Sequence, residues 1–156
     1  GMLLATLEQT TVLRGDGGFG GPSDPVRPPH PMPDRDPDDA VELATRPEQA
    51  LLYRLNGDDN PLHVDPAVAR AAGFGRPILH GLCTFGFAAR AVLREYCDYD
   101  VAKFKAIKVR FSRPVFPGET IVTEMWKESE DKVIIRCKTA ERGEYCLTNA
   151  AVWLNP

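Results

Sequence analysis

The stretch Leu82–Cys97, LCTFGFAARAVLREYC, carries the strongest helical pattern in this chain. Its apolar residues recur every three or four positions, while Arg90, Arg94 and Glu95 mark a polar side. Gly86 stands inside this pattern, where a glycine costs about 1 kcal/mol relative to alanine. We therefore predict a long buried helix that another element approaches closely at Gly86, as a curved sheet wrapped around the helix would.

Four strand-like stretches follow the helix and indicate the sheet that packs on it. The break Ser112–Glu119, SRPVFPGE, interrupts them because its prolines and glycine prevent continuous pairing. One apolar helix followed by several strands predicts an α+β domain with an antiparallel sheet. The four stretches are Lys103–Phe111, Thr120–Lys127, Lys132–Thr139 and Tyr145–Leu154.

Shorter elements precede the helix. Residues 40–44 alternate as a first strand, and Pro47 then stands in the first turn of a helix with Ala50, Leu51 and Tyr53 on its inner side. This helix is expected to end at Asn56-Gly57. A second short helix is expected over residues 67–72, because Asp65-Pro66 is a helix-start signal.

The turn Tyr53–His63, YRLNGDDNPLH, is the candidate site for chemistry. Gly57 allows a backbone conformation that other residues resist, and Pro61 fixes its own φ. A rigid turn of this kind can hold the Asp58 carboxylate and the His63 imidazole towards one point. General acid and base catalysis requires that arrangement.

The N-terminal part has a different composition. Leu3–Arg14 has the β-branched content of a strand, and residues 22–37 hold seven prolines, which predicts a semi-rigid extended connector rather than a packed element. Residues 15–20 match the spacing G-x-G-x-x-G. We reject a dinucleotide site there, because prolines follow where a helix would have to begin.

Composition excludes several classes of function. The 156 residues are enough for one domain with a core, and 19 basic against 22 acidic residues, without a dense basic run, disfavour nucleic acid as a partner. No apolar run is long enough to span a membrane. The four cysteines form no CxxC pair and lie in apolar stretches, so we expect reduced core thiols in an intracellular protein. They are Cys83, Cys97, Cys137 and Cys146.

Three blocks together resemble the MaoC-like (R)-specific enoyl-CoA hydratases, also called hydratase 2, which have the hot-dog fold. The blocks are Tyr53–His63 with Ala69 beyond it, Pro77–Gly81 (PILHG) and Arg110–Glu119 (RFSRPVFPGE), in the family's order. The likeness is closest to the C-terminal half of the two-repeat hydratases of multifunctional β-oxidation enzymes. It implies a hot-dog domain over residues 38–156, a linker over 22–37 and, over 1–21, the end of a preceding repeat.

The resemblance implies water addition to trans-2-enoyl-CoA without metal or redox cofactor. Asp58 and His63 would act as acid and base, Asn60 would orient the water or Asp58, and the Gly81 N–H would stabilise the oxyanion. The residues expected to bind substrate are Phe111, Gly57 and His80. A single repeat leaves a sheet edge exposed, so we expect a homodimer. The C-terminal Trp-Leu-Asn-Pro is not a peroxisomal address, so we expect a cytoplasmic protein.

Alternatives stay open at this point. A truncated half could bind acyl-CoA or a partner chain without turnover, because the family's first repeat supplies part of the CoA surface. A hot-dog acyl-CoA thioesterase is the other rival. For individual residues, the ligand pattern of a calcium loop is absent around Asp58. His80-x-x-Cys83 has no second pair of zinc ligands, and Cys83 fits an inert thiol as well as a nucleophile.

Overall fold

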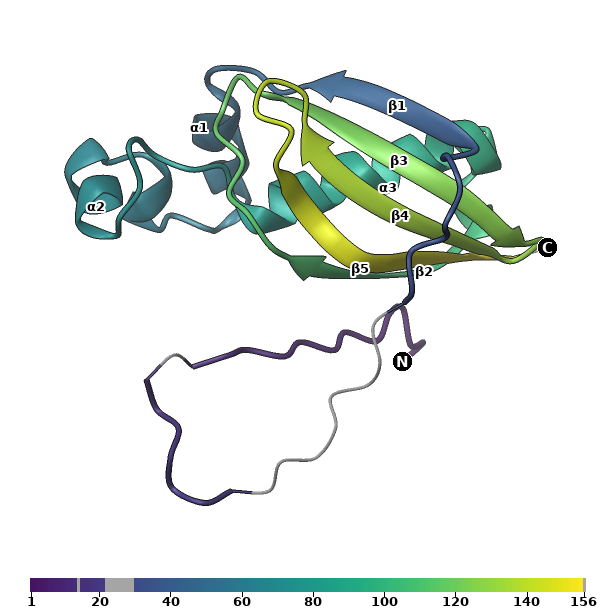
Figure 1. The fold of residues 1–156 in the computed structure, drawn as a ribbon, viewed down its shortest axis with the longest axis horizontal. Coiled ribbons are helices and arrows are strands. Elements are labelled where there is room, and N and C mark those ends of the chain that lie inside the picture. Colours follow the sequence, from purple (N-terminus) through teal and green to yellow (C-terminus); the bar gives the residue numbers. More distant parts are fainter. Residues whose placement is uncertain (14, 22–29, 156) are drawn as a thin grey trace.

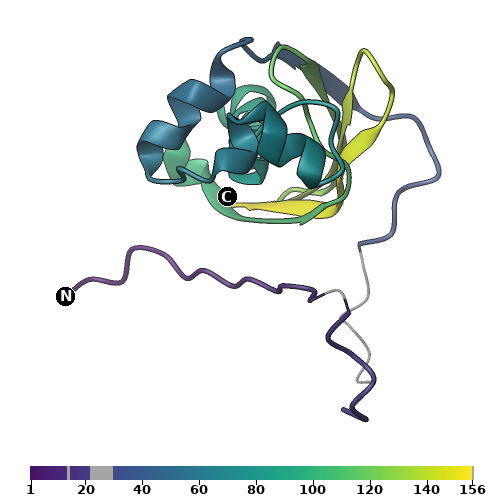
Figure 2. The same cartoon turned by 90° about the vertical axis from the view of Figure 1, so that its left-hand side faces the viewer.

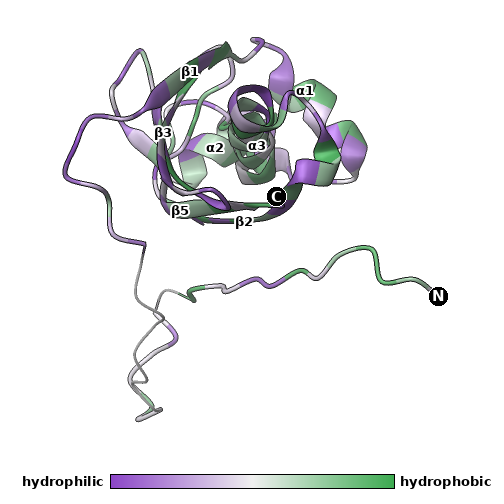
Figure 3. Ribbon diagram, turned by 90° about the vertical axis from the view of Figure 1, so that its right-hand side faces the viewer, coloured by the Kyte–Doolittle hydropathy of each residue, from purple (hydrophilic) through white to green (hydrophobic). Residues whose placement is uncertain are grey.

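The long helix α3 (Gly81–Cys97) lies in the curve of a five-stranded antiparallel sheet (Figures 1 and 3). The computed structural model describes residues 1–13, 15–21 and 30–155. The strand order is β1-β3-β4-β5-β2, so β1 and β2 are the edges. A sheet wrapped around a long helix is the hot-dog fold, and the predicted fold class is confirmed.

Five of the six predicted strands are present. They pair antiparallel over most of their length, with bulges between β2 and β5. Along each strand, successive side chains point to opposite faces of the sheet. The strands are β1 (Asp39–Ala44), β2 (Phe104–Phe111), β3 (Thr120–Ser129), β4 (Lys132–Thr139) and β5 (Tyr145–Leu154).

Alanines, rather than Gly86, face the sheet from α3. Ala88, Ala91 and Val92 are fully buried in the core. Gly86 is exposed, and a Cβ added there would meet no atom within 4 Å. The predicted close approach at Gly86 is therefore wrong, because this residue lies on the side of α3 that points away from the sheet.

Helices α1 and α2 lie at the end of the molecule where α3 begins (Figures 1 and 2), whereas the 3-10 helix η3 (Val101–Lys103) follows the other end of α3. Helix α1 (Gln49–Tyr53) continues as the 3-10 helix η1 (Arg54–Asn56), which ends at Gly57 with a φ of 104°. Helix α2 (Pro66–Ala71) is capped by the Asp65 carboxylate. The predicted helices are present, and the predicted end at Asn56-Gly57 is confirmed. Pro47 does not stand in the first turn as predicted, because α1 begins only at Gln49, and α2 lies one residue earlier than the predicted range 67–72.

Helix α1 buries less than predicted. Ala50 is in the core, but Leu51 is 54% exposed, so its predicted inner position is wrong. With five residues, α1 has room for only one side chain directed fully into the core.

Residues 30–37, here called the strap, pack on the outer face of the sheet. The Trp126 indole N–H donates to the Arg35 carbonyl at 2.9 Å. Met32 of the strap packs against an outer cluster formed by Trp126, Ile134 and Ala151. The prediction of an unpacked connector is wrong for the strap, because indole and apolar surface on the sheet gives it partners. The rest of the proline-rich segment, residues 22–29, lies outside the described residues.

The strand predicted over Leu3–Arg14 does not form within the described residues 1–13. These residues are exposed and have no regular structure, and residue 14 is not described. A strand needs a partner for its backbone groups, and neither edge of the sheet pairs with this segment.

Burial makes the four thiols unreactive. All are free and buried, as predicted. Burial raises the pKa of Cys83 to about 11 and, as the largest cause, that of Cys146 to about 11. At neutral pH these thiols stay protonated, which disfavours Cys83 as a nucleophile. Among the helices of the described residues, none has the length and apolar character needed to cross a bilayer.

Candidate active site

The turn after α1 is built by its own side chains. The Asn60 side-chain oxygen accepts from the Leu62 N–H at 3.0 Å and so begins the 3-10 helix η2 (Pro61–His63). The Asn60 backbone N–H lies 3.4 Å from Asp58 Oδ1. Asn60 was predicted to orient a water or Asp58. Its amide oxygen is instead used by the turn, so we assign Asn60 the task of holding the turn.

His63 presents one ring nitrogen as a base. The imidazole is buried, and its Nδ1 lies 2.8 Å from the Ile78 carbonyl oxygen. A carbonyl only accepts, so the proton of the neutral ring is on Nδ1. The Nε2 lone pair of His63 is then left to accept a proton from a water.

His80 lies behind this base. It is 1% exposed, and its ring is stacked on the His63 ring and tilted against that of Tyr53. Its Nε2 lies 3.1 Å from the Asp58 carbonyl oxygen, to which it donates, while its buried Nδ1 has no partner among the described residues. Burial lowers the pKa of His80, so the ring is neutral at pH 7.

This position does not support the predicted role of His80 in substrate binding. The ring is enclosed by Tyr53, His63 and the Asp58 backbone, and it is absent from the lining of the nearby cavity. His80 instead contacts both members of the predicted acid and base pair.

Asp58 and His63 converge as the sequence predicts. A carboxylate oxygen of Asp58 and a ring nitrogen from each of His63 and His80 lie within 4.8 Å of one another. By distance the three groups could also hold a metal ion. Since His63 Nδ1 and His80 Nε2 already make hydrogen bonds, the ion would have to bind His63 Nε2, the atom needed for proton transfer.

A cavity of about 380 Å³ opens next to His63. His63, Gly81 and Phe111 line it from η2, α3 and β2, so three predicted site residues from distant parts of the chain meet there. The Phe111 ring lies over Gly81, because a Cβ on Gly81 would be 3.2 Å from its Cε1 atom. The other lining residues are Phe74, Ile78, Leu79, Thr84, Ser112, Arg113, Pro114, Val115 and Cys146.

Gly81 lines this cavity with the free N-terminal end of a helix. It is the first residue of α3, and the first N–H groups of a helix have no partner within the helix. Within residues 30–155, no backbone acceptor receives the Gly81 N–H. Gly57 does not line the cavity, so its predicted contact with substrate is not supported. Its part is the left-handed turn that ends η1.

Sequence reasoning missed two features of this site. The Ile78 carbonyl selects the His63 tautomer. Every residue has a backbone carbonyl, so the sequence cannot show which one bonds His63. The break between β2 and β3 forms one wall of the cavity through Ser112, Pro114 and Val115. Its proline and glycine content indicated a loop, and only the matching RFSRPVFPGE block gave a hint of function.

Known proteins match this chain over most of its length. Residues 29–149 match the family described as MaoC like domain. The mouse protein named peroxisomal multifunctional enzyme type 2 is 53% identical over 144 residues, covering 91% of this chain and 20% of the mouse chain. The Dictyostelium discoideum protein named probable enoyl-CoA hydratase 2 is 47% identical over 146 residues, covering 92% of this chain and 50% of that protein.

A solved structure shares the fold. The crystal structure of a MaoC-like dehydratase from Phytophthora capsici superposes with a TM-score of 0.86 at 45% identity, covering 91% of this chain and 50% of that chain. This chain therefore spans half or less of the length of these three proteins.

Proposed function

Because this chain belongs to the MaoC-like domain family, we propose that it is a hydro-lyase that adds water to trans-2-enoyl-CoA and forms (R)-3-hydroxyacyl-CoA in fatty acid metabolism. The observation that carries the proposal is that His63 and Gly81 line one cavity, while a carboxylate oxygen of Asp58, which is not among the lining residues, lies within 4.8 Å of a ring nitrogen of His63. The name enoyl-CoA hydratase 2 of the Dictyostelium relative supports the same reaction.

In the proposed reaction one water supplies both new groups of the product. His63 Nε2 and the Asp58 carboxylate hold the water, and its hydroxyl oxygen forms the bond to C3. A proton returns from the pair to C2, so the double bond is lost and the atoms of one water are accounted for. Acid and base catalysis of this kind contributes roughly 10²–10⁴-fold to the rate.

The Gly81 N–H would stabilise the charge that develops on the thioester oxygen. The N-terminal end of α3 carries the positive end of the helix dipole, which favours a negative charge there. One oxyanion donor is typically worth about 2.7–4 kcal/mol in the transition state. A glycine at this position also leaves the space in which the thioester oxygen can approach.

We propose that no metal or redox cofactor takes part. Water addition changes no oxidation state overall, and the base, the acid and the oxyanion donor are all groups of this chain. Dialysis against EDTA should leave the rate of hydration unchanged. A rate that falls with EDTA and returns with a divalent cation would instead assign the cluster of Asp58, His63 and His80 to a metal.

The test of the function is hydration of crotonyl-CoA and of a longer trans-2-enoyl-CoA, with the configuration of the product determined by a stereospecific dehydrogenase. We expect turnover and the (R)-product. No rate above buffer from a chain with a folded circular dichroism spectrum would favour a half-hydratase that binds acyl-CoA or a partner chain. Release of free thiol from a saturated acyl-CoA would favour the thioesterase.

We further propose that two copies of the chain form a homodimer. Among the described residues, β2 is an edge strand that no further strand pairs with, and the Dictyostelium and Phytophthora relatives are about twice as long as the matched region. A second copy could take the place of their additional half. Light scattering after size exclusion should give about twice the chain mass of 17.2 kDa.

The cytoplasmic location stays a prediction. The mouse relative carries the word peroxisomal in its name, which makes the peroxisome the competing compartment. Fluorescence microscopy of the tagged protein in its own cells, beside a peroxisomal marker, decides between the two.

A further inference from the structure

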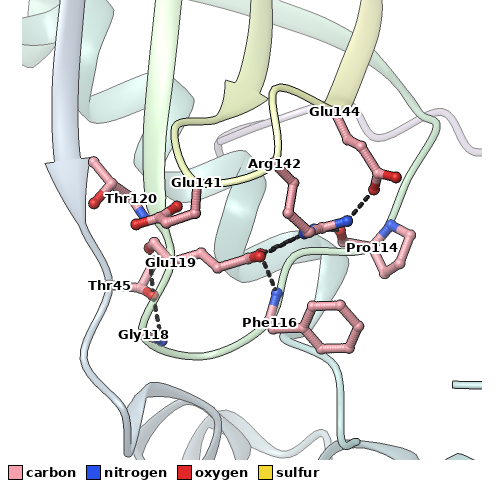
Figure 4. A network of polar contacts seen from close by, with 9 residues as sticks. All are labelled: Thr45, Pro114, Phe116, Gly118, Glu119, Thr120, Glu141, Arg142 and Glu144. Atoms are coloured by element: carbon pink, nitrogen blue, oxygen red, sulfur yellow. Dashed lines mark hydrogen bonds and ion pairs between the residues drawn. The ribbon is translucent and has the colours of Figure 1, made fainter. Parts of the chain in front are cut away.

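A buried ion pair fixes the loop between β2 and β3 (Figure 4). Glu119 is 5% exposed, and both of its carboxylate oxygens accept hydrogen bonds from Arg142, which lies in the turn between β4 and β5. One of these oxygens also accepts from the Phe116 N–H at 2.8 Å. The carboxylate therefore holds a strand end, a loop and a turn together.

Arg142 also contacts the same loop directly. Its Nη2 donates to the Pro114 carbonyl at 2.7 Å, and its Nη1 pairs with the Glu144 carboxylate. The Phe116 ring is flanked by two guanidinium groups, with the Arg142 carbon 5.0 Å and the Arg76 carbon 4.8 Å from its centroid. Arg142 thus reaches the loop on both sides of Val115.

The held loop is a wall of the proposed active site and is bonded to the segment before α3. Pro114 and Val115 line the cavity. The Val115 carbonyl accepts from the Leu79 N–H at 2.7 Å. Leu79 stands directly after Ile78, whose carbonyl sets the His63 tautomer, and two residues before Gly81, which offers the oxyanion donor.

We propose that Glu119 and Arg142 are positioning residues of the hydration reaction. Through Pro114 and Phe116 they fix the cavity wall, and through the Val115 to Leu79 bond they fix the backbone that carries the Ile78 carbonyl and the Gly81 N–H. This inference rests on the proposed function. Neither side chain lines the cavity, so neither is called catalytic.

The sheet offers a matched control on its other face. Glu124 is 7% exposed and accepts from Arg136 at 2.9 Å and from Lys138 at 2.6 Å. It neighbours the core residue Met125 in β3 and so points to the face opposite α3 and the cavity. Loss of Arg136 removes a partner from an equally buried carboxylate without touching the loop.

The experiment compares Arg142→Met and Arg142→Lys with Arg136→Met. The values of kcat and KM for crotonyl-CoA are measured at a temperature at which circular dichroism shows each variant fully folded. We expect Arg142→Met to lower kcat/KM by roughly 10–100-fold, because small displacements of reacting groups cost about that much. Arg136→Met should keep the wild-type kcat/KM even though its melting temperature falls.

Arg142→Lys is included in case Arg142→Met does not fold. Lysine keeps the charge beside Glu119 but lacks the planar fork that bonds Glu119 and Pro114 together. We expect it to fold and to lose part of kcat. Wild-type kcat/KM in folded Arg142→Lys and Arg142→Met would overturn the inference, as would an equal loss in Arg136→Met.

A second measurement separates this inference from the proposed function. The side-chain resonances of His63 are followed by NMR in all three variants, without any substrate. We expect them to shift in the Arg142 variants and to stay unchanged in Arg136→Met. If the wild type does not hydrate enoyl-CoA, the proposed function fails, and the resonances alone decide whether the pair positions His63.

Discussion

The imidazole of His63 is stacked on that of His80, with ring centroids 3.7 Å apart and ring planes 26° from parallel. The two residues come from different elements, η2 and the start of α3. His80 also donates to the Asp58 carbonyl. The buried His80 ring therefore contacts both residues of the proposed acid and base pair. In the proposed reaction Asp58 and His63 transfer protons, and His80 holds them in place.

Replacing His63 with Gln, or Asp58 with Asn, should lower the rate of hydration by roughly 10²–10⁴-fold, since each change removes one proton-transfer group. The melting temperature should change little for Asp58→Asn, because that side chain is exposed. The measurement is steady-state hydration of crotonyl-CoA with a thermal melt of each variant. Activity within a few-fold of wild type in either variant would refute the assigned roles.

Replacing His80 with Phe should lower kcat by roughly 10–100-fold and leave KM nearly unchanged. Phenylalanine keeps an aromatic ring beside His63 but cannot donate to the Asp58 carbonyl, so the pair loses its alignment. Tyr53→Phe is the matched control, because it keeps the ring against His80. A rise in KM with unchanged kcat would restore the predicted role of His80 in substrate binding.

Replacing Gly81 with Ala should reduce kcat by roughly 10–100-fold without unfolding the chain. The new Cβ would stand 3.2 Å from the Phe111 ring, which lines the cavity, so the ring would have to shift within the proposed thioester site. Adding Phe111→Ala removes the crowding and should recover part of kcat relative to Gly81→Ala. Full activity of Gly81→Ala alone would exclude the close approach of the thioester to the N–H.

Replacing Gly86 with Ala should stabilise the chain by about 0.4–1 kcal/mol, because alanine lowers the entropy of the unfolded chain and a Cβ has open space there. Urea denaturation of both proteins measures the difference. The rate of hydration should not change, since Gly86 lines a separate hollow on α3 beside Tyr53 and Arg90. A slower rate would show that the acyl chain uses that hollow.

Acid should destabilise the fold partly through Glu124. Burial alone raises the pKa of this carboxyl, but hydrogen bonds from Lys138 and Arg136 outweigh it, so the pKa lies below its ordinary 4.5. A lowered pKa adds stability above the unfolded value, and this is lost as pH falls through the folded value. The free energy of unfolding should therefore fall below about pH 4.5, and less steeply in Glu124→Gln. Equal slopes would contradict this assignment.

The sequence predicted the elements whose local pattern agrees with their surroundings. Strand β4 has the bounds expected, because its β-branched residues are flanked by the charged turns 128–131 and 141–144. Gly57 ends η1 as expected, because its φ of 104° suits glycine. Asp58 and His63 lie close together as expected, because only four residues of a tight turn separate them.

The predictions were wrong where contacts between residues far apart in the sequence determine the structure. A helical pattern rich in small residues does not say which of them faces the sheet, so Gly86 was assigned to the wrong side of α3. Strand propensity over Leu3–Arg14 does not provide the second strand that pairing requires. The strap packs through the Trp126 indole and a backbone carbonyl of Arg35, a contact between residues far apart that proline content does not reveal.

The buried cysteine thiols can report when different parts of this fold open. An alkylating reagent reaches Cys137 of β4 only after the sheet has opened, whereas Cys97 reports on the end of α3. Mass spectrometry of the modified peptides over time therefore orders the openings of helix and sheet in the unaltered chain, with no engineered label.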